Sequence, residues 1–209
     1  RLHLDPCWTN DPNLPVTGEE TGEANISQFS EKRLRTYLST LYWKIIEKAL
    51  DHGLYVVVRP PGVCPGGIKV DGYYQDYLLK VWDIVSSNTN IKKHSGQVSI
   101  ELANEPVNIY DADSLESARA PYDFFQPIVD KIRANGFDGI IWVPGTGWQS
   151  NYTCYKSNPI EGYNLGYAVH AYVGWYINSD ENANGETFIQ EFGKAVPVVN
   201  TNPVIITEV

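Results

Sequence analysis

Apolar residues along the chain form two alternating patterns, short uninterrupted runs and longer stretches with helical spacing. Short unbroken runs are typical of strands buried on both faces in a parallel sheet, and apolar residues every three or four positions are typical of covering helices. The sequence predicts strands at residues 1–5, 54–58, 96–105, 139–144, 166–172 and 203–208. It predicts helices at residues 30–53, 73–86, 114–135 and 186–196.

The segments between these elements have the composition of loops. Residues 6–25 and 63–72 are rich in glycine, proline and polar residues, which predicts exposed loops. Residues 145–149 form a shorter loop with Trp148 near its middle. Each predicted strand except the last is therefore followed by a helix or a long loop.

This alternation predicts βα units in a parallel sheet with right-handed crossovers. A closed (β/α)₈ TIM barrel uses eight such units, and the strands here correspond to strands two to seven. We therefore expect a single catalytic domain over residues 1–209 with a truncated TIM barrel, its first and last units missing. Open sheet edges would then favour self-association. A doubly wound open sheet is the alternative, but no Gly-x-Gly-x-x-Gly turn follows any strand.

Two glutamates lie at the ends of predicted strands. Glu105 follows one strand in Asn104-Glu105-Pro106, and Glu208 ends the last strand. In parallel barrels, residues at the carboxyl ends of strands meet on one face, where active sites lie. A glycosidase needs at least two carboxyl groups at its active site, so this pair indicates a glycosidase.

The charge and composition narrow the class of ligand. A net charge of −9 and a pI near 4.9 argue against nucleic acid and anionic membranes as partners. No apolar run approaches the roughly 20 residues that span a bilayer. Tyrosine and tryptophan are abundant, and Trp8, Trp148 and Trp175 fall in predicted loops where they could stack on sugar rings or pack within the loop. A neutral glycan fits this composition best.

The sequence gives no sign of a metal or cofactor site. It contains neither a Cys-x-x-Cys pair nor a His-x-x-x-His pair, so we expect no metal ion and no cofactor. Cys7, Cys64 and Cys154 cannot form a closed disulfide framework without a leftover thiol, and the sequence does not choose a pair.

Three motifs together resemble a known family. Asn104-Glu105-Pro106, His170-Ala171-Tyr172 and Thr207-Glu208 follow one another on the βα repeat as in glycoside hydrolase family 5, the retaining cellulases of clan A. The resemblance implies that Glu105 is the acid/base and Glu208 the nucleophile.

The same resemblance assigns roles to four neighbouring residues. It implies that Asn104 binds the 2-hydroxyl of the substrate and that His170 and Tyr172 orient the site. It also implies that Arg1 keeps the nucleophile ionised.

The chain departs from the family pattern in three places. Arg59-Pro60-Pro61 stands where the family usually has a histidine after strand three, so Arg59 is a candidate for a substrate contact or a salt bridge. The strand-eight tryptophan of the family has no counterpart, and strand one is absent.

The resemblance implies a secreted endo-β-1,4-glucanase that cleaves β-glucan by a retaining mechanism. A β-mannanase or xyloglucanase with the same fold is the nearest alternative, because the loops and not the strands determine which polysaccharide binds. A non-catalytic carbohydrate-binding fragment is the alternative from another class.

Overall fold

The main sheet of the protein contains six parallel strands. The structure is a computed structural model, and it describes residues 1–17, 22–176 and 184–209. The strands lie side by side in the order β1-β2-β4-β6-β7-β8, and every pairing is parallel. Their bounds are Leu2–His3, Val56–Arg59, Val98–Glu101, Ile141–Pro144, Leu165–His170 and Val204–Glu208.

The order of the strands distinguishes the two predicted architectures. A doubly wound sheet reverses its strand order at a switch point, whereas a barrel wall adds each new strand on the same side. Here the order in space follows the order in the chain without a reversal. The sheet is therefore built as a barrel wall, with β1 and β8 at its two edges among the described residues.

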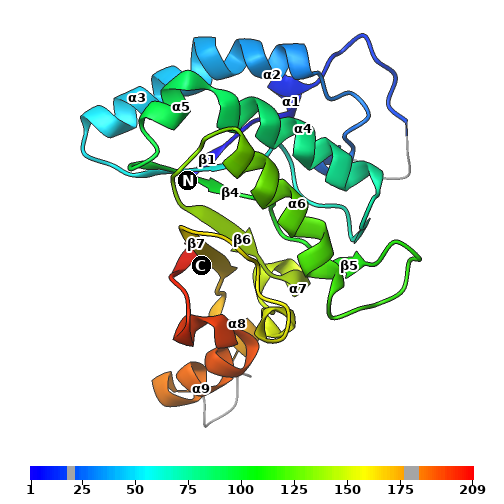
Figure 1. The fold of residues 1–209 in the computed structure, drawn as a ribbon, viewed down its shortest axis with the longest axis vertical. Helices are drawn as coiled ribbons and strands as arrows, with labels where there is room; N and C mark the ends of the chain where they lie inside the picture. Colours follow the sequence, from blue (N-terminus) through cyan, green and yellow to red (C-terminus); the bar gives the residue numbers. More distant parts are fainter. Residues whose placement is uncertain (18–21, 177–183) are drawn as a thin grey trace.

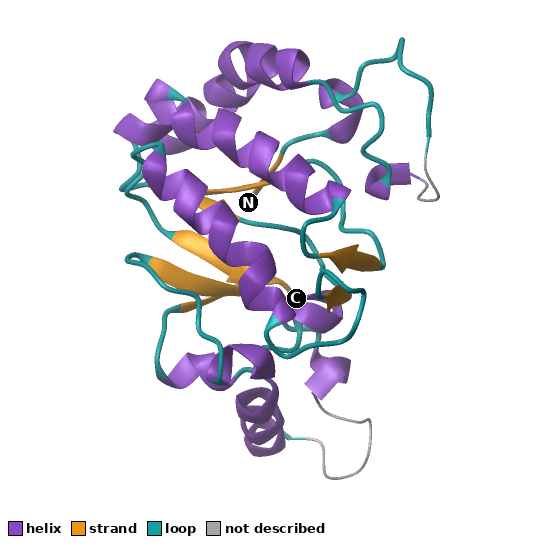
Figure 2. Ribbon diagram, turned by 45° about the vertical axis from the view of Figure 1, so that its right-hand side comes forward, coloured by secondary structure: helices purple, strands orange, loops and turns teal. Residues whose placement is uncertain are grey.

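Helices cover the outer face of this sheet. Helix α2 (Glu31–Tyr37) continues through one π-helical turn (Leu38–Tyr42) into α3 (Trp43–Asp51). Together these segments correspond to the single helix predicted at residues 30–53. Helices α4 (Tyr73–Ser87) and α6 (Ala120–Ala134) lie side by side across the sheet (Figures 1 and 2). On the face of α4 that packs on the sheet, Leu78 and Trp82 are fully buried.

The remaining helices are short, except for the last. They are α1 (Pro6–Thr9), α5 (Thr89–Lys93), α7 (Thr146–Gln149), α8 (Val173–Tyr176) and α9 (Gly185–Ala195), with 3₁₀ turns at Gly22–Ala24, Thr153–Lys156 and Pro197–Asn200. Figure 1 shows α8 and α9 at the opposite end of the molecule from α2 and α3. No helix among the described residues is long and apolar enough to cross a membrane.

Several predicted boundaries were wrong. Leu54 and Tyr55 are 59% and 75% exposed, and β2 begins only at Val56, so the apolar run is not buried throughout. The helix predicted from residue 114 begins at Ala120, because Ser114 has a φ of +66°, in the left-handed region that helices exclude. Helix α5 was not predicted.

The predicted loops contain more structure than their composition suggests. Residues 6–25 include α1 and a 3₁₀ turn, and residues 18–21 lie outside the described part of the chain. The glycine-rich loop at residues 63–72 contains β3 (Gly67–Lys69), which pairs in parallel with β5 (Asn108–Tyr110) as a second, two-stranded sheet. All three cysteines are free thiols, and Cys64 is buried.

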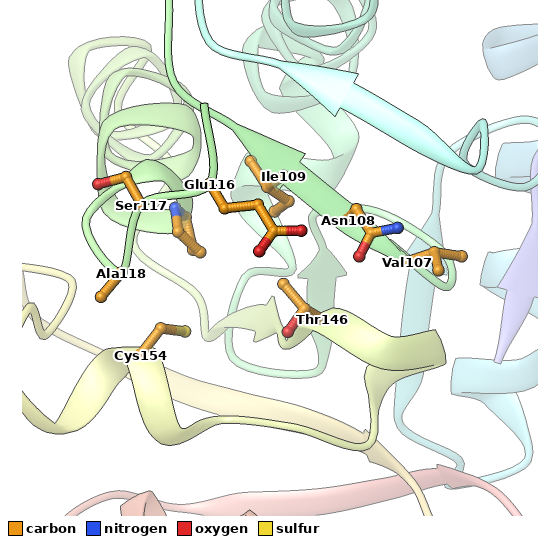
Figure 3. A pocket seen from close by; sticks show the side chains of 9 residues that line it. Val107, Asn108, Ile109, Glu116, Ser117, Ala118, Thr146 and Cys154 are labelled. Carbon is orange, nitrogen blue, oxygen red and sulfur yellow. The ribbon is translucent and has the colours of Figure 1, made fainter. Parts of the chain in front are cut away.

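A cavity of about 310 Å³ opens beside β5 and α7. Figure 3 shows Asn108, Glu116 and Thr146 among its lining side chains, with Cys154 at one end. Its wall includes none of the predicted site residues.

Candidate active site

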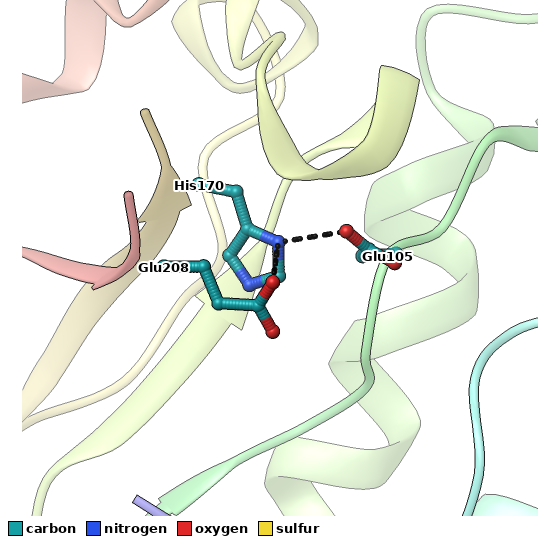
Figure 4. Close-up of side chains that lie close together, drawn as sticks. All are labelled: Glu105, His170 and Glu208. Carbon is teal, nitrogen blue, oxygen red and sulfur yellow. Dashed lines mark hydrogen bonds and ion pairs between the residues drawn. The ribbon is translucent and has the colours of Figure 1, made fainter. Parts of the chain in front are cut away.

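Three predicted site residues from distant parts of the chain meet at the carboxyl ends of β4, β7 and β8. Glu105 follows β4, His170 is the last residue of β7, and Glu208 is the last residue of β8. The Nδ1 atom of His170 lies 3.1 Å from Oε1 of Glu105 and 3.6 Å from Oε2 of Glu208. In Figure 4, dashed lines join one ring nitrogen of His170 to a carboxyl oxygen of each glutamate.

The separation of the two carboxyl groups is short. One side-chain oxygen from each glutamate and Nδ1 of His170 all lie within 4.8 Å of one another. Retaining glycosidases place their two carboxyl groups about 5 to 5.5 Å apart, whereas inverting enzymes need about 6.5 to 9.5 Å to admit a water molecule. The geometry matches the retaining arrangement.

Arg1 connects four groups of the site. Its guanidinium makes an ion pair with Glu208 and another with Glu101, where Nε lies 2.7 Å from Oε2. Nη2 also donates to Oδ1 of Asn104 at 2.7 Å and lies 3.2 Å from Nε2 of His170. The structure thus places Arg1 beside Glu208.

These contacts favour one tautomer of His170. Nε2 of His170 faces Nη2 of Arg1, which carries protons and cannot accept, so the contact favours a neutral imidazole with its proton on Nδ1. Nδ1–H then donates to Glu105 at 3.1 Å, while the 3.6 Å separation from Glu208 is too long for a hydrogen bond. Burial lowers the pKa of His170 to about 4, so the ring is neutral at neutral pH.

The same group is the one cluster of potential metal ligands among the described residues. A metal ion on Nδ1 would require the ring proton to move to Nε2, which faces the donor Nη2 of Arg1. The hydrogen-bond pattern therefore fits a proton on Nδ1 and not a metal ion.

The two glutamates have opposite electrostatic surroundings. Burial and the nearby charge of Glu208 raise the pKa of Glu105 above its ordinary value. Burial alone would raise the pKa of Glu208, but His170, the Tyr172 hydroxyl and Arg1 outweigh burial and lower it. The Tyr172 hydroxyl donates to Oε2 of Glu208 at 2.9 Å. The surroundings thus favour the acid form of Glu105 and the ionised form of Glu208.

The predicted aromatic residues lie at different places around this centre. Trp175 is 44% exposed, and its ring centroid lies 4.8 Å from that of Tyr172. Trp148 is 54% exposed and lies in α7, two residues beyond Thr146. Trp8 packs on the helical layer instead, with its ring 5.9 Å from Tyr37.

Arg59 ends β2, and its Nη1 atom donates to the carbonyl of Gly62 at 2.9 Å. The charges of Arg1, Glu101 and Glu208 all act on its pKa, which burial lowers. Arg59 therefore lies close to the site, although its hydrogen bond is to the protein's own backbone.

Two buried residues of the site, Glu101 and Gln149, were not predicted from the sequence. Glu101 is fully buried, and its carboxylate accepts from Arg1, Gln149 and Thr207. Gln149 is also fully buried, and its amide contacts both Glu101 and the backbone of Glu105. A charged residue inside an apolar strand was the available signal for Glu101, because buried charges require partners. Gln149 gave no such signal.

Comparison with known families gives a match over nearly the whole chain. The profile of the family described as Cellulase (glycosyl hydrolase family 5) matches residues 13–209. This match confirms the resemblance that the three motifs indicated.

Curated relatives share limited identity. An endoglucanase from Bacillus sp. (strain KSM-635) is 30% identical over 141 residues, which are 64% of this chain and 14% of that protein. An endoglucanase from Halalkalibacter akibai is 27% identical over 162 residues, 73% of this chain and 19% of that protein. The chain thus spans less than a fifth of either relative.

Solved structures share the fold. A beta-glucanase from Saccharophagus degradans superposes with a TM-score of 0.59 at 20% identity, covering 83% of this chain and 53% of that one. The catalytic domain of a Thermobifida fusca endoglucanase gives 0.59 at 21% identity, covering 86% and 53%. With the strand order, these likenesses confirm the partial (β/α)₈ barrel predicted from the sequence.

Proposed function

Because the chain belongs to glycosyl hydrolase family 5, we propose that it hydrolyses β-1,4-glucan internally, as a retaining endo-β-1,4-glucanase. The observation that carries this proposal is the pair of carboxyl groups, which lie within 4.8 Å of each other through one oxygen each. Their pKa values are displaced in opposite directions, as an acid and a nucleophile require. The curated relatives named endoglucanases support the choice of substrate.

The first step forms a covalent intermediate. The ionised carboxylate of Glu208 attacks the anomeric carbon of a bound glucose unit, and the bond from that carbon to the glycosidic oxygen breaks. Glu105 gives its proton to the leaving oxygen, so the leaving chain departs as an alcohol. Arg1 and Tyr172 hold Glu208 in its ionised form before the attack.

The second step returns both residues to their starting states. Once Glu208 is esterified, its negative charge no longer raises the pKa of Glu105, and Glu105 can act as a base. It takes a proton from a water molecule, whose oxygen attacks the anomeric carbon and releases Glu208. Two displacements at one carbon retain the β configuration.

The remaining predicted residues would bind and orient the substrate. Oδ1 of Asn104 accepts from Arg1, so its amide nitrogen is the donor left for the 2-hydroxyl of the sugar. His170, neutral with its proton on Nδ1, orients the carboxyl group of Glu105 through the 3.1 Å contact. Exposed Trp148 and Trp175 offer flat faces on which pyranose rings can stack.

We also place this activity outside the cell. A polymeric β-glucan is too large to enter a cell intact, so an enzyme that cuts its interior acts where the polymer lies. The net charge of −9 suits a neutral polysaccharide, because it gives no attraction to nucleic acid or anionic lipid.

The test is reducing-sugar release from carboxymethylcellulose, mixed-linkage β-glucan and mannan. We expect release from the two glucans, loss of release in Glu105→Gln and in Glu208→Gln, and full release in Glu47→Gln. Glu47 is an exposed glutamate on α3 and serves as the matched control. Glycan binding without release by the unchanged chain would contradict the proposal, as would release that survives both site substitutions.

A further inference from the structure

The backbone of Glu105 has an unfavourable conformation. Its φ is +57°, in the left-handed region that side chains other than glycine seldom adopt. Such a conformation persists only where the surrounding structure holds it. Pro106 follows directly and cannot donate a backbone hydrogen bond. The support for Glu105 must therefore come from another part of the chain.

That support is the turn formed by Gly147, Trp148 and Gln149. These three consecutive residues have φ values of +58°, +59° and +61°, so the whole turn is left-handed. The backbone N–H of Gly147 donates to the carbonyl of Val107 at 2.9 Å. The N–H of Trp148 donates to the carbonyl of Pro106 at 3.0 Å. The turn thus binds the two residues that follow Glu105.

The side chain of Gln149 completes the contact. Its Oε1 accepts the backbone N–H of Glu105 at 2.7 Å, and its Nε2 donates to Oε1 of Glu101 at 2.9 Å and to the carbonyl of Ala168 at 3.1 Å. Gln149 is fully buried, so water cannot replace these bonds. Glu101 in turn binds Arg1, which pairs with Glu208.

We propose that Gln149 is a positioning residue for the reaction, which fixes the left-handed backbone of Glu105 and links it through Glu101 and Arg1 to Glu208. This role uses both ends of the amide. Oε1 accepts the backbone N–H of Glu105, and Nε2 donates to the buried carboxylate of Glu101, which is itself held by Arg1 and Thr207. The inference rests on the proposed function, because it assumes that Glu105 transfers the proton.

The chain offers a matched control for this role. Gln75 is also buried, and its Oε1 accepts the N–H of Asp71, which has a φ of +57°. Its Nε2 donates to the carbonyls of Asp123 and Phe124. Gln75→Met and Gln149→Met therefore each remove one bond from a left-handed backbone N–H and two bonds from the amide nitrogen, one variant in the helical layer and the other at the site.

We expect both variants to lose thermal stability, Gln149→Met somewhat more because one of its bonds is to a carboxylate, while only Gln149→Met loses turnover. A misplacement of about 1 Å can cost roughly a hundredfold in rate, so kcat on cello-oligosaccharides should fall by about that factor with KM little changed. A kcat for Gln149→Met equal to that of Gln75→Met would overturn the proposal.

Azide distinguishes a misplaced acid/base from a general loss of structure. The leaving group of 2,4-dinitrophenyl cellobioside needs no proton, so the glycosyl ester with Glu208 forms without an acid. Hydrolysis of this ester then becomes the slow step, because the attacking water needs a base. Azide attacks the anomeric carbon, the ester bond breaks, and glycosyl azide and the Glu208 carboxylate are released without proton transfer. We expect azide to accelerate Gln149→Met and not Gln75→Met. Failure of azide to accelerate Gln149→Met would overturn the proposal.

A second readout does not depend on turnover. In protein labelled with ¹³C at glutamate carboxyl groups, NMR follows the titration of Glu105, assigned with Glu105→Gln. We expect the raised pKa of Glu105 to fall in Gln149→Met and to stay raised in Gln75→Met. An unchanged pKa in Gln149→Met would overturn the positioning role. If the unsubstituted chain is inactive but shows this pKa pattern, the proposed function is wrong and the positioning of Glu105 by Gln149 still holds.

Discussion

Arg1 binds the buried carboxylate of Glu101 with two hydrogen bonds, from Nε to Oε2 at 2.7 Å and from Nη2 to Oε1 at 2.9 Å. The same guanidinium makes an ion pair with Glu208. One cation is thus shared between a fully buried carboxylate and the proposed nucleophile. Bidentate pairing of this kind fixes the orientation of the guanidinium as well as its charge.

This shared pairing predicts an asymmetry between two substitutions. Arg1→Gln leaves Glu101 as a buried charge without a cation, which costs about 3 to 5 kcal/mol of unfolding free energy. Glu101→Gln should cost less, because Arg1 still pairs with Glu208. Urea unfolding of both variants measures the difference. Equal costs would show that Glu101 does not depend on Arg1.

The short carboxyl separation predicts the stereochemical course of hydrolysis. We expect the first sugar released from cello-oligosaccharides to be the β-anomer, because two oxygens of Glu105 and Glu208 lie within 4.8 Å. Proton NMR during the first minutes of reaction distinguishes the β-anomer from the α-anomer before mutarotation. Initial release of the α-anomer would be incompatible with a covalent Glu208 intermediate.

The hydrogen bond from Tyr172 predicts a change in the pH profile. The hydroxyl favours the ionised form of Glu208, so its loss in Tyr172→Phe should raise the pKa of Glu208. Activity rises with pH as Glu208 ionises, and the acid limb of kcat/KM should therefore move to higher pH. The alkaline limb, which reports Glu105, should stay in place. We expect kcat/KM to fall roughly tenfold, the equivalent of one hydrogen bond to a charged group.

Buried His170 predicts a loss of stability in acid. Its pKa is lowered to about 4 from an ordinary value of 6.5, so the unfolded chain binds the proton more readily. The free energy of unfolding should therefore fall as the pH drops from about 6.5 to about 4, by at most about 3.4 kcal/mol. Above pH 6.5 this contribution is constant.

Urea unfolding of the wild type and of His170→Asn over this pH range measures the contribution. The pKa of His3 is also lowered to about 4, but His3 titrates in both proteins and cancels in the difference. A pH dependence unchanged by the substitution would count against a neutral, buried His170.

The strands and the paired glutamates were predictable because each has a local signal. The run from Ile141 to Pro144 is apolar throughout and forms β6, and Glu105 and Glu208 both lie at the ends of predicted strands. The same reasoning placed Leu54 and Tyr55 inside a strand, where both are exposed. An apolar run reports burial on average and cannot locate the residue at which pairing begins.

The supporting contacts were not predictable, because they join residues far apart in the sequence. Glu101 and Arg1 are separated by 100 positions, and Gln149 and Glu105 by 44. A glutamine in a glycine-containing loop has the same local pattern whether it is buried or exposed. The left-handed conformation of Trp148 and Gln149 is equally hidden, since neither residue type favours it.

The left-handed turn has a consequence for engineering. The Trp148 side chain on this turn is exposed to solvent. The backbone N–H groups of the turn bind Pro106 and Val107, and the Gln149 side chain binds the backbone of Glu105. A loop graft intended to change glycan preference at Trp148 would therefore also displace Glu105, the proposed proton donor. Specificity should instead be altered by changing the Trp148 side chain alone, with the glycine before it and the glutamine after it retained.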